Sequence, residues 1–244
     1  MSTTTESREG ALAAGGSLQR DAATLHPRVA RRAWLIAELG LFYIGAPLAI
    51  SWAIFSHGVP LVVALQPILI AFVVYLLWDD SFLLRRELAT GFSFKTLLWL
   101  LLTFLILGAG ITVATYLVFP ERFLALPRYR PDLWHMIMLG YPIASVIPQE
   151  LVYRTFFFHR YGPLFGDMRW LAIAVNGLLF GFAHIIFQNW IAVAGTTVVG
   201  WLIAYRYETS RSFWAAWLEH ALFGCLVFTV GLGGFFFTGV ANLR

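Results

Sequence analysis

Besides Glu38 in the first apolar run, six polar side chains within otherwise apolar stretches of the 244-residue sequence have types that could support chemistry. They fall in three separate stretches, with Gln149, Glu150 and Arg154 in the first, His184 in the second, and Glu219 and His220 in the third. A carboxylate and two histidines on different segments could bind a zinc ion, or could activate a water molecule by general base catalysis. They could also relay protons, as buried Glu and His residues do in membrane transporters. The spacing alone leaves all three uses open.

Glu150 and Arg154 are spaced i, i+4, so on a helix they share one face and can form an ion pair that lowers the cost of burying both. Such a pair needs no function beyond fixing how helices pack. Pro148, however, lacks a backbone N–H and can kink its helix, and Gln149 and Glu150 follow it directly. A kink beside a carboxylate favours a polar cavity at this point.

The two histidines differ in their local sequence. His184 shares a helix face with Asn176 and Phe180, where a lone histidine is more often a core residue than a ligand. His220 directly follows Glu219, and adjacent helix residues point about 100° apart. We therefore expect only one of this pair to face the site, with the other supporting it. Gly224, one turn after His220, leaves space on the histidine's face.

The elements that carry these residues are membrane-spanning helices by composition. The sequence is 59% hydrophobic and 12% charged, with a mean hydropathy of +0.74, which excludes a soluble globular domain. Its seven apolar runs are each long enough to cross a hydrocarbon core of about 30 Å as a helix. The predicted fold is all-α and polytopic, with a single transmembrane domain over residues 33–244 and spans at 34–55, 61–78, 97–119, 133–158, 170–187, 190–207 and 213–237.

The basic residues predict how these helices are oriented. Segments 1–32, 79–95, 159–169 and 206–212 hold five, three, two and two Lys or Arg residues, against three in 120–132 and one at the C-terminus. Because cytoplasmic loops are enriched in Lys and Arg, the N-terminus is predicted in the cytoplasm and the C-terminus outside. Residues 1–32, rich in Ser, Thr, Ala, Gly and Arg, are predicted to form a disordered cytoplasmic tail.

The composition also limits the covalent links, metal sites and partners that are possible. The sequence has one cysteine, Cys225, so neither an intramolecular disulfide nor a zinc site with paired thiolates can form. The formal net charge of +4 does not indicate a nucleic-acid partner, because no basic block with interleaved aromatic residues occurs.

Three short motifs follow one another on successive apolar segments. They are Gln-Glu-Leu-Val-Tyr-Arg at 149–154, Phe-Gly-Phe-Ala-His at 180–184 and His-Ala-Leu-Phe-Gly at 220–224. They resemble the Glu-Glu-x-x-x-Arg, Phe-x-x-x-His and His-x-x-x-Asn motifs of the CAAX-protease and bacteriocin-processing (CPBP) family of intramembrane proteases. Each motif alone is weak, but three in this order are fairly specific. The resemblance covers residues 133–237, which form the motif-bearing core.

The resemblance implies a site buried among the last four helices. In the family, the first Glu of the pair and the His of the second motif activate a water molecule, while the His and Asn of the third motif hold the oxyanion. Carried over, His184 would assist the water, His220 would stabilise the tetrahedral intermediate, and Arg154 would hold Glu150 in place. A glutamic mechanism without a cofactor is favoured. A zinc ion at Glu150, His184 and His220 stays open as an alternative.

The sequence departs from the family pattern at two positions. Gln149 stands where the family has its water-activating Glu, and an amide has no useful basicity, so Gln149 is not the base. Gly224 stands where the family has Asn. Three interpretations follow: Glu150 acts as the base with Gln149 as a hydrogen-bond donor, Glu219 supplies the missing charge, or the protein binds a partner without cleaving it.

The expected function is that of an intramembrane endopeptidase that cleaves a membrane-associated protein substrate, with Glu150 and His184 as the water-activating pair. The expected location is the cytoplasmic (inner) membrane of a bacterium. Its partners would be that substrate and the lipid bilayer, with no nucleic acid. The alternative is a non-catalytic, CPBP-like binding or immunity protein. A proton-coupled transporter is disfavoured because no internal repeat suggests inverted halves.

Overall fold

The structure, a computed structural model, describes residues 29–79, 82 and 84–236. These residues form helices joined by short turns, and no strand occurs among them, which confirms the all-α fold class. The first 28 residues of the predicted tail and residue 237 of the predicted core lie outside the described residues. The chain divides into two compact units, residues 1–41 and 42–244, and each is described by itself.

The described part of the first unit is helical. Residues 29–40 are α-helical, so this helix already begins within the last four residues of the segment predicted as a tail. Glu38, the charged residue of the first predicted span, lies in it. No motif residue falls in this unit.

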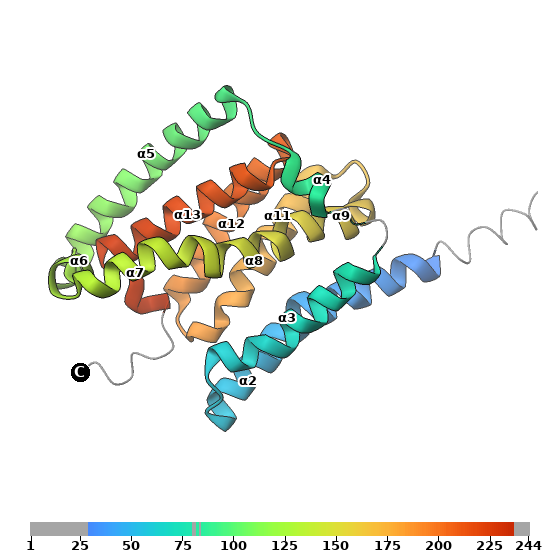
Figure 1. Ribbon diagram of the computed structural model, residues 1–244, viewed down its shortest axis with the longest axis horizontal. Helices are drawn as coiled ribbons and strands as arrows, with labels where there is room; N and C mark the ends of the chain where they lie inside the picture. The colour runs from blue at the N-terminus through green and yellow to red at the C-terminus, as the bar shows by residue number, and fades with distance from the viewer. Residues whose placement is uncertain (1–28, 80–81, 83, 237–244) are drawn as a thin grey trace, which may run out of the picture. The chain divides into compact units, whose positions relative to one another are not determined.

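The second unit holds all three motifs and consists of helices of very different lengths (Figure 1). Short π-helical segments, η1, η3 and η4, and short 3-10 segments, η2, η5 and η6, interrupt or end them. In chain order the segments are η1 (Leu41–Gly45), α2 (Ala46–His57), α3 (Leu61–Trp78), α4 (Leu84–Ala89), α5 (Phe94–Val118), η2 (Pro120–Arg122), α6 (Ala125–Tyr129), α7 (Pro131–Tyr141), η3 (Pro142–Val146), α8 (Ile147–Glu150), η4 (Leu151–Phe156), α9 (Phe157–Arg160), α10 (Gly162–Phe165), α11 (Arg169–Ala183), η5 (His184–Phe187), α12 (Trp190–Ser210), α13 (Phe213–Val230) and η6 (Gly233–Phe236).

Four helical segments are long and apolar enough to cross a membrane, namely Val29–His57, Phe94–Val118, Arg169–Phe187 and Phe213–Val230. Each coincides with one of the predicted spans. The other three predicted spans are also helical, in α3, in α12 and in the interrupted helix between residues 131 and 160. These apolar helices support an integral membrane protein, whereas seven crossings and their orientation stay predictions.

Local sequence explains where the long helices begin and end. Ser93, Asn189 and Ser212 precede α5, α12 and α13, and each side chain accepts a hydrogen bond from a backbone N–H of the first turn. Gly231 ends α13 at a φ of 108°, a left-handed conformation that glycine adopts without a steric cost. Large apolar side chains are exposed all along α5, as expected of a helix in contact with lipid.

The first motif lies on a helix that is twice interrupted. Between residues 131 and 160 the chain stays helical, but the π-helical segments η3 and η4 flank the single turn of α8 that carries Glu150. The kink predicted at Pro148 therefore takes the form of π-helical turns on both sides of the carboxylate. Such turns are frequent at functional sites because they leave backbone carbonyls without their usual partners.

Helices α11 and α12 pack closely because small residues lie between them. A Cβ added at Gly177 would overlap the ring of Trp201, and one added at Gly181 would overlap Thr197. The Trp201 indole also donates a hydrogen bond to the carbonyl of Ala174 over 2.9 Å. Close approach of this kind is typical of helix pairs in membranes. It fixes the second motif, which ends α11, against α12.

The structure changes the place of one basic residue. The sequence assigns Arg206 to a cytoplasmic loop, but α12 continues to Ser210 and the side chain of Arg206 is buried. Its neighbours Tyr205 and Tyr207 give no sign of this burial, because the partner of Arg206 is Glu219 of another helix, α13. The loop between α12 and α13 consists of Arg211 and Ser212.

Candidate functional site

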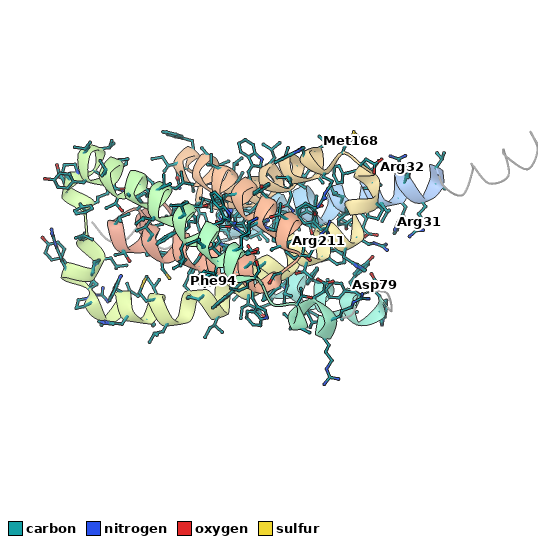
Figure 2. The ribbon with its side chains drawn as sticks, turned by 90° about the horizontal axis from the view of Figure 1, so that it is seen from above. Arg31, Arg32, Asp79, Phe94, Met168 and Arg211 are labelled. Atoms are coloured by element: carbon teal, nitrogen blue, oxygen red, sulfur yellow. The ribbon has the colours of Figure 1, made fainter. Side chains whose placement is uncertain are left out.

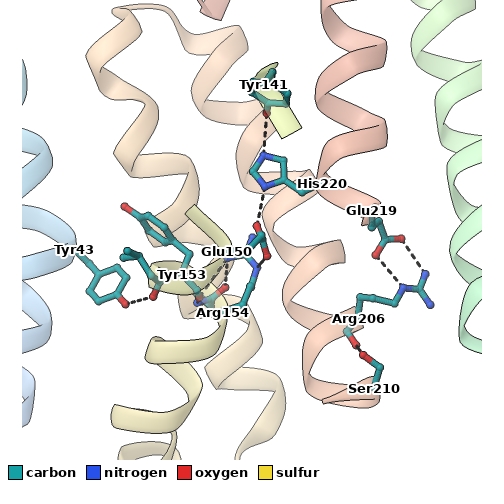
Figure 3. Close-up of polar contacts among 11 residues, drawn as sticks. Tyr43, Tyr141, Glu150, Tyr153, Arg154, Arg206, Ser210, Glu219 and His220 are labelled. Carbon is teal, nitrogen blue, oxygen red and sulfur yellow. Dashed lines mark hydrogen bonds and ion pairs between the residues drawn. The ribbon is translucent and has the colours of Figure 1, made fainter. Parts of the chain in front are cut away.

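Glu150 is the centre of a buried polar cluster within the second unit (Figure 3). Its side chain has no exposed surface, and its Oε1 accepts a hydrogen bond from Nδ1 of His220 over 2.7 Å. Its Oε2 lies 3.5 Å from Nε of Arg154, one helical turn later. The first and third motifs are therefore joined by a direct contact, and the ion pair predicted from the i, i+4 spacing is present.

Arg154 is held from a third helix. Its Nη1 donates to Oδ1 of Asn176 over 2.7 Å, and its guanidinium lies 4.6 Å from the centre of the Phe180 ring. Both contacts come from α11, the helix of the second motif. Arg154 thus links the first motif to the second, and the three motifs form one cluster.

The π-helical turn after Glu150 is stabilised by side chains from elsewhere in the chain. Asn176 donates its Nδ2 to the carbonyl of Tyr153, and the hydroxyl of Tyr43 donates to the carbonyl of Val152 over 2.6 Å. These carbonyls belong to η4, where the usual helical pattern is broken. Asn176 therefore satisfies the backbone beside Arg154 while also holding the guanidinium.

His220 makes a hydrogen bond through each ring nitrogen. Besides the bond from Nδ1 to Glu150, its Nε2 lies 3.1 Å from the hydroxyl of Tyr141, at the end of α7 (Figure 3). An ionised carboxylate only accepts hydrogen bonds, so Nδ1 carries a proton. Glu150, His220 and Tyr141 form a continuous hydrogen-bonded chain.

His184 lies outside this hydrogen-bonded chain, one helical turn after Phe180. Its Nδ1 donates to the carbonyl of Phe180 over 2.8 Å. The Phe180 ring contacts both histidines, with its centre 4.9 Å from that of His184 and 5.3 Å from that of His220. Among the residues that the structure describes, His184 makes no hydrogen bond to Glu150 or His220. The water-activating role of Glu150 with His184 stays a prediction, and the histidine in direct contact with Glu150 is His220.

The two remaining candidates point away from the cluster. Gln149 donates its Nε2 to the hydroxyl of Ser145 over 2.8 Å, one turn earlier on the same helix. Glu219 accepts two hydrogen bonds of 2.9 Å from Arg206. Figure 3 shows Glu219 and His220 directed to different partners, as their offset of about 100° predicts. Glu219 is occupied by this ion pair, which favours a supporting role.

Several buried polar atoms of the cluster are available for a ligand. Oε2 of Glu150 and both Nε and Nη2 of Arg154 are buried and have no hydrogen-bond partner among the described residues. Nε2 of His184 likewise takes part in no hydrogen bond within the described chain. These atoms can accept from or donate to a small polar molecule such as water or to a peptide group.

The same geometry bears on the zinc alternative. Both nitrogens of His220 are engaged, and Glu150 is ion-paired with Arg154, so the residues do not present a set of free ligand atoms. No group of three or more His, Cys, Asp or Glu side chains in the described ranges has a spacing that could hold a metal ion. As arranged, these residues fit an acid–base cluster better than a zinc site.

Two residues of the cluster, Asn176 and Tyr141, and Arg206, the partner of Glu219 outside it, are not predicted as site residues. Asn176 carried a signal, because a single amide in an apolar helix needs a partner, and it was recognised only as a neighbour of His184. Arg206 was assigned to a loop. Tyr141 gives no signal, since it lies inside the predicted span 133–158 and an uncharged tyrosine there does not need a partner as an ionisable residue does.

Comparison with known proteins agrees with the motifs. Residues 131–226 match the family model described as type II CAAX prenyl endopeptidase Rce1-like. The matched segment contains all three motifs and lies within the core predicted over 133–237 apart from its first two residues, so the resemblance is confirmed. No curated protein and no solved structure gives a significant match to the chain.

Proposed function

We propose, on the premise that residues 131–226 belong to the type II CAAX prenyl endopeptidase Rce1-like family, that the protein is an intramembrane endopeptidase with Glu150 as general base. The family suggests an intramembrane peptidase, and the apolar helices suit one. The buried hydrogen bond between Glu150 and His220 carries the residue assignment. A carboxylate and an imidazole in contact in an apolar interior are suited to acid–base chemistry.

The proposed reaction begins with a water molecule beside Oε2 of Glu150. Glu150 removes a proton from the water while the oxygen attacks the carbonyl carbon of the scissile peptide bond. His184 assists, because its Nδ1–H donates to the carbonyl of Phe180 and Nε2 keeps a lone pair that can accept a proton. The proton then passes to the leaving nitrogen, and the C–N bond breaks.

The other cluster residues would support the charge changes. Arg154 lies beside the carboxylate, and its Nε and Nη2 have no hydrogen-bond partner among the described residues, so its charge and N–H groups would stabilise the negative charge of the tetrahedral intermediate. His220, with both ring nitrogens engaged, would hold Glu150 in place. Gln149 and Glu219 have partners outside the cluster and take no part in this scheme.

The proposed substrate is a protein associated with the membrane, and the proposed location is the cytoplasmic membrane of a bacterium. The matching family model is named for a CAAX prenyl endopeptidase. The first probe is therefore a prenylated peptide that ends in a CAAX sequence.

The test uses the protein in liposomes with a quenched fluorescent prenylated peptide. Glu150→Gln and His184→Ala should each lower kcat/KM by at least about 100-fold. Helicity by circular dichroism should stay at the wild-type value, and each variant should melt above the assay temperature, so that the loss of activity is not a loss of folding. Glu121→Gln, an exposed carboxylate on η2, is the matched control and should keep full activity. Cleavage at the wild-type rate by either variant would overturn the assignment.

Metal dependence is tested in the same assay. Cleavage that persists after incubation with a strong chelator supports the glutamic mechanism. Loss of cleavage that zinc restores would instead support a metalloprotease.

A second candidate function is binding without cleavage. It is favoured by Gln149 and Gly224, which replace the Glu and Asn of the motifs, and by the ion pair that already occupies Glu150. On this interpretation the wild-type protein cleaves no peptide, and His184→Ala and His220→Ala leave partner binding unchanged.

A further inference from the structure

Tyr141 contacts the Glu150 cluster although it lies more than two helical turns before the first motif. It is the last residue of α7, nine positions before Glu150, and its side chain extends toward α13 (Figure 3). Its hydroxyl lies 3.1 Å from Nε2 of His220, while Nδ1 of the same ring lies 2.7 Å from Glu150. A single imidazole therefore bridges two residues of one interrupted helix.

Gly224 makes this approach possible. It follows His220 by one helical turn, and a Cβ added there would overlap the Tyr141 ring at both Cε1 and the hydroxyl. Any larger residue would displace the ring. The space noted beside His220 in the sequence is therefore filled by Tyr141.

One face of α13 holds the tyrosine and the turn after it. Trp217, His220, Gly224 and Phe228 are spaced by three, four and four residues, as one helix face requires. The Trp217 indole donates to the carbonyl of Pro142 over 2.8 Å. The Phe228 ring packs on Tyr141 with centres 5.5 Å apart. The position of Tyr141 is thus determined on both sides of its contact with His220.

The contact with the Tyr141 hydroxyl suits both protonation states of the imidazole. Because Nδ1 donates to Glu150, a neutral His220 has its lone pair on Nε2, and the Tyr141 hydroxyl donates to it. When the ring carries a second proton, the same hydroxyl can accept from Nε2–H. Tyr141 can therefore hold the ring in one orientation through both protonation states.

We propose that Tyr141 is a positioning residue, which fixes the orientation of the His220 ring and through it the position of Oε1 of Glu150, while Glu150 sets the tautomer. Gly224 is the space that this requires. The consequence for catalysis rests on the proposed function, whereas the effect on the histidine does not.

The effect on His220 is tested by NMR of the full-length protein with ¹⁵N-labelled histidine in detergent micelles. The six histidines of the sequence can be assigned by subtraction with His220→Gln. In the wild type, the His220 ring should show a protonated Nδ1 and a hydrogen-bonded, unprotonated Nε2. Tyr141→Phe should shift the Nε2 resonance, and Tyr205→Phe, a tyrosine stacked on Trp170, should leave it unchanged. An Nε2 resonance that Tyr141→Phe does not move would overturn the proposal.

The effect on catalysis is measured with the prenylated peptide. Tyr141→Phe should lower kcat by about 10- to 100-fold, the effect expected when a hydrogen bond in a network that contains charged groups is lost. KM should change by less than about twofold. Gly224→Ala should also lower kcat, and Gly195→Ala, a helical glycine with no atom within 4 Å of an added Cβ, should not. A wild-type kcat in Tyr141→Phe would overturn the positioning role. If the wild type cleaves no peptide, the proposed function fails and the NMR result alone decides the contact.

Discussion

Two buried carboxylates, Glu150 and Glu219, have opposite surroundings although both lie in apolar helices. Glu219 is closed by Arg206, which donates to both of its oxygens. Glu150 shares Oε1 with His220, and its Oε2 lies 3.5 Å from Nε of Arg154, an ion pair without a hydrogen bond, so Oε2 has no hydrogen-bond partner in the described chain. A carboxylate with both oxygens bound to a cation is suited to holding helices together, and one with a free oxygen beside an imidazole is suited to proton transfer.

The role of Glu219 can be tested by stability. Glu219→Ala leaves the buried Arg206 without its partner and should lower the free energy of unfolding by about 3–5 kcal/mol. The double variant Glu219→Leu with Arg206→Met should recover most of this, since an apolar pair of similar volume replaces two buried charges. Denaturant titration in detergent, followed by tryptophan fluorescence, measures both.

Glu121→Ala, at an exposed position, is the control and should change the free energy of unfolding by less than about 0.5 kcal/mol. The double variant has neither the ion pair nor its two buried charges. If it were as unstable as Glu219→Ala, the unpaired charge of Arg206 would not be the cause of the instability.

The sequence alone identifies the ionisable residues in apolar helices, but it does not identify the residues that they contact. Glu150, Arg154, His184 and His220 stand out because ionisable residues are costly in apolar helices. Tyr141 does not stand out, and only the close approach at Gly224 brings it to His220. Contacts of this kind depend on how two helices pack, which spacing along one helix does not reveal.

At the scale of helices, the turn after Glu150 depends on α11. The π-helical segment η4 exposes the carbonyl of Tyr153, which Asn176 satisfies while it also holds Arg154. The apolar runs predicted that helices exist here and roughly where they end. They did not predict the π-helical turns, since these depend on partners supplied by other helices.

Asn176→Leu tests this dependence, because leucine has a similar size and offers no hydrogen bond. It should lower the free energy of unfolding by about 1–3 kcal/mol, the cost of leaving buried polar groups unpaired. It should also lower kcat of peptide cleavage, because Arg154 loses its anchor. Gln66→Leu, an exposed amide on α3, is the matched control. Unchanged stability and rate in Asn176→Leu would show that η4 is held by other contacts.

At the scale of the second unit, the segments joining its helices gather at two ends. Glu208 pairs with both Arg169 and Arg211, and the Ser212 hydroxyl donates to the carbonyl of Thr90. Figure 2 draws these side chains and labels Met168, which precedes Arg169, and Arg211. At the other end, the backbone N–H of Leu124 donates to the carbonyl of Val230 at the end of α13. Residues of the loops 79–95, 159–169 and 206–212, predicted as cytoplasmic from their basic residues, thus lie together at one end. The loop 120–132, predicted outside, lies at the other end.

The orientation of these two ends can be tested by cysteine labelling in spheroplasts. On a Cys225→Ala background, single cysteines are placed at Thr90, Asp167 and Glu121, which lie outside the motifs. Moving Arg206 into a helix still leaves an excess of Lys and Arg in the loops on the predicted cytoplasmic side. An impermeant maleimide should therefore label position 121 in intact spheroplasts and label 90 and 167 only after lysis. Labelling of 90 and 167 from outside would reverse the orientation. If 90 and 167 fell on opposite sides, the contacts that join their loops at one end would themselves be wrong.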